Sequence, residues 1–442
     1  MKRSLYSKLI AWKEKKNRKP LLLQGARQVG KTWLIEEFGK IEFKTLHKFN
    51  FQEEPALSTL FKETLNPQKI IKTLELNYAA NIDISNDLIF FDEIQECPEA
   101  ITSLKFFKEN LPDAAVCCAG SHIGVSRSET SFPVGKVDTL TLYPMSFYEF
   151  IINNHPELAD LLLNPEEIPE LLHKRLLDLL KVYYVIGGMP EANLLYYQDK
   201  ELNPNMFSQI RLVQKQILTG YTSDFAKHAG KVNANHIVRV FENTPTQIMK
   251  TDDYSVNRYR FKDVVPGYSK YAQLIGPIEW LLKSGLCYPV YVIENPATPL
   301  RANRKENIFK LMLLDIGLLN CMNNLSLRSI MSQNLGSYKG YLAENFTAQE
   351  LVAYGMEDLY SWTGRTSEVE FLLPIGESVI PLEIKSGKRI ARTKSLDVFI
   401  RKYQPEVSFI SSMRSYRKLD NKKNIPLYSL ISIMLERESR SF

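Results

Sequence analysis

A glycine-rich run near the N-terminus has the residue types and spacing that hold phosphate groups. It reads Gly25-Ala26-Arg27-Gln28-Val29-Gly30-Lys31-Thr32. Its glycines let the backbone turn tightly, so that successive N–H groups face an anion. Lys31 can reach the β- and γ-phosphates, and the Thr32 hydroxyl can bind Mg²⁺. The run predicts a site for ATP with Mg²⁺, against the alternative of a chance match.

Two adjacent carboxylates follow an apolar run later in the chain. Leu88-Ile89-Phe90-Phe91 leads directly into Asp92-Glu93. Ligands of parallel sheets gather at the carboxyl ends of the strands, so we expect this pair beside the glycine-rich loop. Asp92 would support the Mg²⁺ shell and Glu93 would polarise the attacking water, which makes Glu93 and Lys31 the expected catalytic residues. Alone, such a pair is usually an ordinary exposed loop.

A serine follows a third apolar run, Cys117-Cys118-Ala119-Gly120-Ser121. Ser121 at the end of a central strand is a candidate for sensing the γ-phosphate beside the attacking water. The alternative is a plain turn that ends the strand, and the sequence leaves both interpretations open.

A second set of carboxylates lies near the C-terminus. Glu383-Ile384-Lys385 follows Glu370 on the next expected strand, and Glu344 lies upstream on an expected helix. This arrangement resembles the active site of PD-(D/E)xK nucleases, in which Glu370 and Glu383 would hold Mg²⁺ and Lys385 would orient water or neutralise phosphate charge. However, Val369-Glu370 stands where that motif usually has Pro-Asp. Surface acids without metal, or an inactive binding module, are the alternatives.

The hydrophobic pattern supplies elements to hold these residues. Residues 1–150 alternate short apolar runs with helical patterns, which predicts an α/β fold with a parallel sheet covered on both faces. The expected strands are 20–24, 48–51, 88–91, 114–119 and 137–143 in this part, 287–293 and 309–314 in the middle, and 368–373, 379–385 and 407–411 near the end. Residues 146–225 read as mainly helical, with a break at Gly187-Gly188-Met189-Pro190.

Taken in order, the motifs resemble a family of prokaryotic AAA-like ATPases related to the STAND-type NTPases, which end in a C-terminal domain of unknown function. The matching segments occur in order along nearly the whole chain, at 25–32, 91–95, 119–121, 142–147, 187–191, 313–319 and 383–387. The resemblance implies an ATPase core at 1–150, a helical lid at 151–228, a winged-helix-like module at 229–325 and a nuclease-like domain at 335–442.

The resemblance also bears on two positions. It implies that Pro190, in the turn after Gly188, packs near the base of the nucleotide, although a helix breaker between two lid helices explains that proline equally well. Many relatives have Gly-Arg before the last core strand, whereas this chain has Gly135-Lys136. Lysine lacks the forked donors of an arginine finger, so completion of the site by a neighbouring subunit cannot be assumed and homo-oligomerisation stays open.

Composition limits the class of protein. The chain has 442 residues, 44% hydrophobic and 24% charged, with a net charge of +6, which is typical of a globular protein of several domains. Five scattered cysteines, no apolar leader and no run of about 18 apolar residues predict a cytoplasmic protein with no membrane span.

Basic residues dominate the region from Lys385 to Lys423, at 388, 389, 392, 394, 401, 402, 414, 417, 418 and 422. They suit contacts with DNA, or simply a solvated face.

Overall fold

Residues 1–121, 132–229, 231–250, 258–387 and 393–440 are described by a computed structural model of the chain. They separate into two units. The first comprises Met1–Tyr143 with the short segment Lys283–Gly285, and the second comprises Pro144–Leu282 and Leu286–Phe442.

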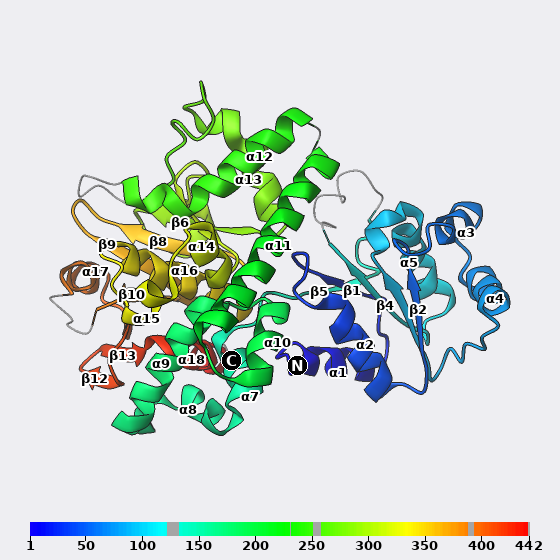
Figure 1. Ribbon diagram of the computed structural model, residues 1–442, viewed down its shortest axis with the longest axis horizontal. Helices are drawn as coiled ribbons and strands as arrows, with labels where there is room; N and C mark the ends of the chain where they lie inside the picture. The colour runs from blue at the N-terminus through cyan, green and yellow to red at the C-terminus, as the bar shows by residue number, and fades with distance from the viewer. Residues whose placement is uncertain (122–131, 230, 251–257, 388–392, 441–442) are drawn as a thin grey trace. The chain divides into compact units, whose positions relative to one another are not determined.

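The first unit contains a five-stranded sheet in which all pairs of neighbouring strands are parallel (Figure 1). The strands are β1 (Leu21–Gln24), β2 (Leu46–Asn50), β3 (Leu88–Asp92), β4 (Ala115–Gly120) and β5 (Asp138–Thr141). Their spatial order is β2-β3-β4-β1-β5. Every residue of β3 and β4 is buried, as expected for strands covered on both faces. The α/β fold predicted from the apolar runs is therefore confirmed.

Helices cover both faces of this sheet. They are α1 (Tyr6–Glu14), α2 (Lys31–Glu42), α3 (Leu57–Glu63), α4 (Pro67–Tyr78) and α5 (Pro98–Asn110). Helix α2 packs on β2, β3 and β4 and also contacts α1. Helices α3, α4 and α5 form a separate cluster with the opposite face of the same strands. Because successive strand residues alternate between faces, Phe91 belongs to that cluster while Phe90 points to the α2 side.

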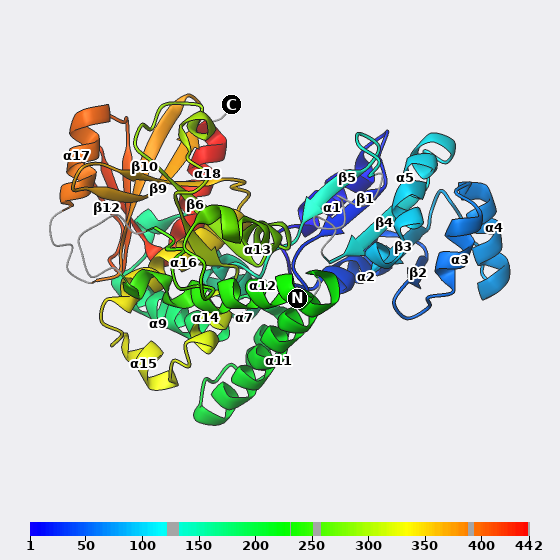
Figure 2. The ribbon, with the colours of Figure 1, turned by 90° about the horizontal axis from the view of Figure 1, so that it is seen from above.

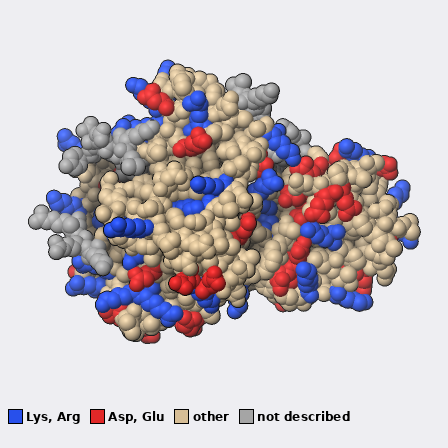
Figure 3. All heavy atoms as spheres, viewed as in Figure 1, with Lys and Arg blue, Asp and Glu red and all other residues tan. Residues whose placement is uncertain are grey.

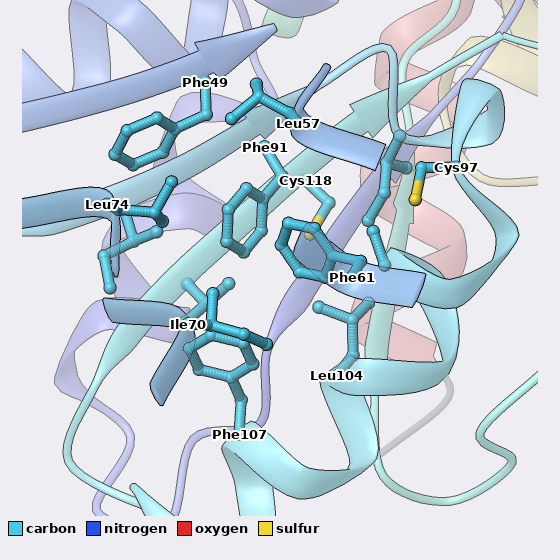
Figure 4. Close-up of a cluster of buried hydrophobic side chains, with 14 of the residues drawn as sticks. Phe49, Leu57, Phe61, Ile70, Leu74, Phe91, Cys97, Leu104, Phe107 and Cys118 are labelled. Atoms are coloured by element: carbon cyan, nitrogen blue, oxygen red, sulfur yellow. The ribbon is translucent and has the colours of Figure 1, made fainter. Parts of the chain in front are cut away.

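Aromatic side chains fill the core beneath α3, α4 and α5 (Figure 4). The ring of Phe91 lies 5.5 Å from that of Phe61 and 5.9 Å from that of Phe107, both nearly edge-to-face. Phe49 and Phe51, from the end of β2, pack against the same ring at 6.0 Å. Burial of one such side chain stabilises a protein by roughly 1.5–3 kcal/mol. This packing fixes the carboxyl end of β3, where Asp92 lies.

The second unit contains a mixed sheet of eight strands, in the spatial order β12-β13-β11-β10-β9-β8-β6-β7. The strands are β6 (Cys287–Ile293), β7 (Phe309–Leu313), β8 (Leu359–Thr363), β9 (Glu368–Ile375), β10 (Ser378–Lys385), β11 (Ser408–Ser412), β12 (Arg417–Leu419) and β13 (Lys422–Pro426). Strands β9 and β10 form an antiparallel pair, and β10 pairs with β11 in parallel.

Twelve helices are described in this unit (Figure 2): α7 (Phe147–Asn154), α8 (Ala159–Leu163), α9 (Glu170–Ile186), α10 (Pro190–Asp199), α11 (Pro204–Ala229), α12 (Lys231–Asn243), α13 (Tyr271–Lys283), α14 (Ile316–Met322), α15 (Leu327–Ser332), α16 (Tyr338–Ala353), α17 (Lys394–Tyr403) and α18 (Leu430–Arg440). Local sequence begins several of them. Ser146 and Glu149 form a capping box at the start of α7, and the side chain of Asp315 caps α14. Helix α16 packs on β7 and β10, and α17 packs on β9 and β10.

The predicted middle and C-terminal modules share one sheet. The antiparallel pair β6–β7, at the expected strand positions, joins the C-terminal strands because β6 pairs with β8 in parallel. The division of this unit into a lid (151–228), a winged-helix-like module (229–325) and a C-terminal domain (335–442) therefore stays a prediction.

Candidate functional site

The glycine-rich loop joins β1 to α2 in the first unit. A side chain at Gly25 would not fit, because a Cβ atom there would lie 2.2 Å from the carbonyl oxygen of Leu142. Gln28 and Gly30 have positive φ angles, of 65° and 92°, and α2 begins directly afterwards at Lys31. The backbone therefore reverses before the helix, and the first N–H groups of α2 open toward the loop, as anion binding at a helix N-terminus requires.

Arg3 holds this loop through its backbone. Its guanidinium is buried and donates hydrogen bonds to the carbonyl oxygen of Val29 at 2.9 Å and to that of Tyr143 at 2.6 Å. It thereby ties the N-terminal segment to the loop and to the end of the unit. No local pattern marks this arginine, because both of its partners are distant in sequence.

The ammonium of Lys31 lies at the centre of the loop. It donates to the carbonyl oxygens of Ala26 at 2.8 Å and Gly25 at 3.2 Å, and to the hydroxyl of Ser121 at 3.3 Å. Burial lowers the pKa of Lys31 to about 8, against the opposing charges of Glu93 and Asp92. The structure thus brings Lys31, Ser121 and the two acids together, while the sensing role of Ser121 stays a prediction.

Asp92 ends β3 beside Thr32. Its carboxylate accepts a hydrogen bond from the Thr32 hydroxyl at 3.0 Å. Lys48 and Asn50, from the neighbouring strand β2, approach the same carboxylate at 3.4 Å and 3.3 Å. Burial raises the pKa of Asp92 despite the hydrogen bond from Thr32. The sequence analysis missed Lys48 and Asn50, although the parallel register, which places Asn50 opposite Asp92, links them to the site.

These residues fit a magnesium ion. A hydroxyl and a carboxylate in contact are the hard oxygen ligands that Mg²⁺ prefers, and this ion usually takes only one or two protein carboxylates beside water and phosphate oxygens. Among the described residues there is no cluster of three or more His, Cys, Asp and Glu side chains suited to a metal. A P-loop magnesium site does not need such a cluster, and Thr32 with Asp92 would hold the ion.

Glu93 follows with an unusual backbone. Its φ angle is 50°, and it immediately precedes the 3₁₀ turn Ile94–Glu96. The Nε2 atom of Gln95 donates to its carboxylate at 2.5 Å. Glu93 lies close enough to Lys31 for its charge to raise the pKa of that lysine, against the effect of burial. A non-glycine residue in the left-handed region is often a sign of functional strain.

Two further basic residues of the first unit have different surroundings. Arg27 lies close enough to Lys31 for its charge to help lower the pKa of that lysine. Lys136, where relatives were expected to have arginine, forms an ion pair with Glu109 at 3.0 Å. Since both of these side chains are partly exposed, the pair adds little stability.

Pro190 begins α10 in the second unit, after the turn at Gly187 and Gly188. The carbonyl oxygen of Gly188 accepts a hydrogen bond from the N–H of Met145 at 2.7 Å, and the N–H of Gly188 donates one to the Asp315 carboxylate at 2.5 Å. These contacts favour the interpretation of the turn as a structural link between α9 and α10. A role for Pro190 in binding nucleotide stays a prediction.

The predicted C-terminal acids lie close together, as expected. Glu344, Glu383 and Lys385 all influence the pKa of Glu370, which burial raises to about 8. Glu383 contacts Lys385 at 2.5 Å and accepts from the N–H of Leu396 at 3.2 Å. One carboxylate oxygen of Glu370 accepts a hydrogen bond from the N–H of Ile384 at 3.0 Å.

A lysine that the sequence analysis missed lies within this cluster. Lys310, on β7, is almost completely buried, with its ammonium 2.9 Å from Glu344 and in contact with Glu368. Burial opposes the charged form of Lys310, yet Glu344 and Glu368 raise its pKa. Glu370 and Glu383 each accept from a backbone N–H group, and Glu383 also contacts Lys385. The expected arrangement of these two acids around Mg²⁺ stays a prediction.

Basic side chains of the C-terminal region are partly neutralised. Lys422 contacts Asp397, and Lys423 pairs with Glu436 at 2.9 Å. Lys388, Arg389 and Arg392 of the predicted basic region lie outside the described residues. Figure 3 shows Lys and Arg side chains gathered over β12, β13 and α9, at the lower left, with acidic side chains beside them.

The parallel sheet, the loop between β1 and α2 and the acids after β3 define the first unit as an α/β core of the P-loop ATPase type. Residues 17–151 match the family model described as an AAA domain. Residues 177–329 and 339–430 match two models described as domains of unknown function, DUF8612 and DUF4143. Neither description mentions a nuclease, so the nuclease-like domain stays a proposal. No curated protein matches the sequence.

Several solved structures match the chain at low similarity. A Walker-type ATPase of Pyrococcus abyssi is 14% identical with a TM-score of 0.43, over 73% of this chain and 95% of that one. The Aeropyrum pernix ORC1 protein, solved in complex with DNA, is 12% identical with a TM-score of 0.29, over 75% and 92%. AMPPCP-bound DnaA from Aquifex aeolicus is 15% identical with a TM-score of 0.26, over 60% and 82%. None of the described helices is both long and apolar enough to cross a membrane.

Proposed function

We propose that this protein is a Mg²⁺-dependent ATPase whose nucleotide state controls a C-terminal part that contacts DNA. The observation that supports ATP binding and hydrolysis most directly is the geometry of the glycine-rich loop. A buried Lys31 is surrounded by loop carbonyl oxygens and by Ser121, while Thr32 and Asp92 are paired beside it. The match to an AAA domain model over 17–151 supports the same assignment.

Each residue has a defined task in this mechanism. The N–H groups of the loop and the ammonium of Lys31 bind the phosphates and stabilise the charge that develops on transfer. Lys31 exchanges its carbonyl partners for phosphate oxygens when ATP binds. A magnesium ion, held by Thr32 and Asp92, would neutralise phosphate charge. Glu93 orients and polarises the attacking water, and Gln95 holds the Glu93 carboxylate in position.

Two substitutions test the ATPase assignment. Lys31→Ala removes the charge that meets the phosphates, so we expect no measurable ATP binding by calorimetry. Glu93→Gln keeps the size of the side chain but not its basicity, so we expect tight ATP binding and a loss of turnover of about 10²-fold or more. Glu96→Gln makes the same change at an exposed position three residues later and is the matched control. Wild-type turnover by Glu93→Gln would show that another group positions the water.

The second candidate function is a nucleotide switch that uses the same site and hydrolyses ATP more slowly. On that interpretation ATP and ADP set two conformations of a signalling scaffold, turnover is very slow, and the basic residues bind an acidic protein. Lys136 supports it, because it stands where an arginine finger was expected, lacks the forked donors of arginine, and forms an ion pair with Glu109. Steady-state ATP turnover, measured at several protein concentrations, separates the two candidates, because the scaffold hydrolyses ATP very slowly at every concentration.

For the C-terminal carboxylates we propose an internal ion-pair role rather than metal-dependent cleavage. The support is Lys310, whose ammonium supplies the positive charge that a divalent cation would otherwise bring to Glu344 and Glu368. Replacing one partner of a buried ion pair leaves the other charge uncompensated, which costs roughly 3–5 kcal/mol. Loss of Lys310 alone would therefore weaken the contact between β7 and α16.

The Mn²⁺ dependence of thermal unfolding tests this proposal on nucleotide-free protein. We expect Mn²⁺ to leave the melting temperature of the second unit unchanged in the wild type. Lys310→Met should lower that temperature and make it rise again with Mn²⁺, because the freed carboxylates then take the ion. Lys305→Met, at an exposed ion pair with Glu294, is the matched control. Mn²⁺-dependent cutting of plasmid DNA by the wild type, abolished by Glu383→Ala, would overturn the proposal.

A further inference from the structure

A hollow of about 620 Å³ lies in the second unit, between α9 and the β11–β13 end of the sheet. Its walls come from two distant parts of the sequence. Helix α9 contributes His173 and Leu177, and the turn after β11 contributes residues 413–416. Pockets that hold small molecules typically measure roughly 300–1,000 Å³, so the hollow is large enough for an organic ligand.

The lining of this hollow separates into an apolar and a basic part. The apolar side chains are Leu177, Ile410, Met413 and Leu419. The basic side chains are Lys174, Arg414, Arg417 and Lys422, whereas Glu170 is the one carboxylate among the described lining residues. Glu170 lies 3.7 Å from Lys174 in an exposed pair, and Lys422 contacts Asp397. The described lining therefore contains more basic than acidic side chains.

Buried hydrogen bonds hold the basic wall in place. The side chain of Asn424 is 6% exposed, and its oxygen accepts from the Ser412 hydroxyl at 2.7 Å. Its amide nitrogen donates to the carbonyl oxygen of Ser415 at 2.8 Å and to that of Arg414 at 3.4 Å. These contacts fix the turn that carries Arg414, so that less side-chain and loop ordering is required when a ligand binds.

The opposite wall is also fixed. His173 is 4% exposed, and its Nδ1 atom lies 2.7 Å from the hydroxyl of Tyr428. Burial lowers the pKa of His173, so the ring is neutral at pH 7. The imidazole therefore adds a rigid polar surface to α9 and no charge.

We propose that this hollow binds a small organic phosphate, with the phosphate among Arg414, Arg417 and Lys422 and the apolar part of the ligand against Leu177 and Met413. Guanidinium groups match phosphate oxygens with paired donors, and the apolar floor suits a ring such as a nucleobase. A concave site of this size encloses a compact ligand, whereas a duplex needs an extended basic track. The ligand would join α9 to the C-terminal strands and so stabilise both.

The site is separable from the P-loop by experiment. The full-length Lys31→Ala protein, without Mg²⁺, is titrated by calorimetry with AMP and, separately, with inorganic pyrophosphate. We expect one binding event for AMP, weakened about tenfold by Arg417→Ala, which is the loss of one charge-assisted contact. Lys418→Ala is the matched control, because Lys418 is the next residue of β12 and does not line the hollow.

Three outcomes would overturn the proposal: absence of AMP and pyrophosphate binding in Lys31→Ala, binding that Arg417→Ala leaves unchanged, or an effect of Arg417→Ala on duplex DNA affinity alone. Binding of pyrophosphate but not of AMP would overturn the proposed contact between the ligand and the apolar side chains, because only the phosphate groups would then be bound. If Lys31 is not the P-loop lysine, the Lys31→Ala protein shows two AMP binding events, and Arg417→Ala weakens one of them about tenfold. The failure of the ATPase assignment is thereby distinguishable from failure of this site.

Discussion

The ammonium of Lys31 lies among oxygen atoms of its own loop, and burial lowers its pKa to about 8 from an ordinary value of 10.5. A bound triphosphate would favour the charged form again. Protonation of this one residue and binding of the nucleotide are therefore linked: above pH 8 the free protein must take up a proton in order to bind.

This linkage predicts the pH dependence of ATP affinity. The affinity should be nearly constant from pH 7 to about pH 8 and then fall, by up to about tenfold per pH unit, as the free lysine loses its charge. Calorimetry in buffers of different ionisation enthalpy measures both the affinity and the proton uptake. The stability of the nucleotide-free protein has the opposite trend and rises between about pH 8 and 10.5, because the unfolded chain then binds more protons.

Lys31→Arg provides the control, since its guanidinium stays charged over this range and the affinity that it keeps should not vary with pH. An ATP affinity of the wild type that is constant from pH 7 to pH 9.5 would contradict the assigned position of the ammonium.

At the scale of elements, the turn between α9 and α10 links three segments of the second unit. Asp315 caps α14 by accepting from the N–H of Leu318 at 2.9 Å, and it also accepts from the N–H of Gly188. Burial raises the pKa of Asp315 to about 6, so its carboxylate is ionised at neutral pH. The glycines are required for this contact, because a Cβ atom at Gly187 would lie 2.3 Å from the Asp315 carboxylate.

A matched pair of substitutions tests that link. A Cβ atom at Gly188 would lie 2.2 Å from the carbonyl oxygen of Met145, so Gly188→Ala should destabilise the second unit by about 1–3 kcal/mol. Gly220, inside α11, has no atom within 4 Å of such a Cβ, so Gly220→Ala should stabilise by about 0.5–1 kcal/mol. Urea denaturation measures both. Equal effects of the two changes would contradict the close packing of the turn.

At the scale of the whole molecule, an ATPase core and a basic C-terminal region belong to one chain but to different units. The proposed function needs nucleotide state to alter what the second unit binds. Basic residues that contact phosphates release counterions, whereas basic residues that meet an acidic protein do not depend on salt in the same steep way.

The affinity for a random DNA duplex should therefore be measured against salt concentration, with ATP and with ADP. We expect log Kd to change linearly with log salt, with a slope of about 0.9 for each phosphate contact, and to differ between the two nucleotides. Lys31→Ala should abolish the difference and leave the slope. Absence of DNA binding at low salt would reject DNA as the partner and favour the signalling scaffold.

Much of the fold could be predicted because its signals are local. The continuous apolar runs at β1, β3 and β4 predict a parallel sheet, and the helix starts follow from capping residues such as Ser146. Three strands were missed for a physical reason. Strand β8 is a short mixed run, β12 is three exposed residues, and β13 begins with two lysines. Pairing, and not an apolar run of their own, makes them strands: β12 and β13 form a hairpin, β13 also pairs with β11, and β8 pairs with β9.

The sequence by itself determined the phosphate loop, because one turn between a strand and a helix brings its residues together. It also indicated that Glu344, Glu370, Glu383 and Lys385 belong together. Only the tertiary structure decided what surrounds them: Lys310 comes from a strand 34 residues before Glu344 and occupies the carboxylate cluster. Arg3 supports the loop across 26 residues, and Asn50 meets Asp92 through strand register. Which charged side chains meet across such sequence separations depends on tertiary packing, and the spacing of residues within a local motif does not encode it.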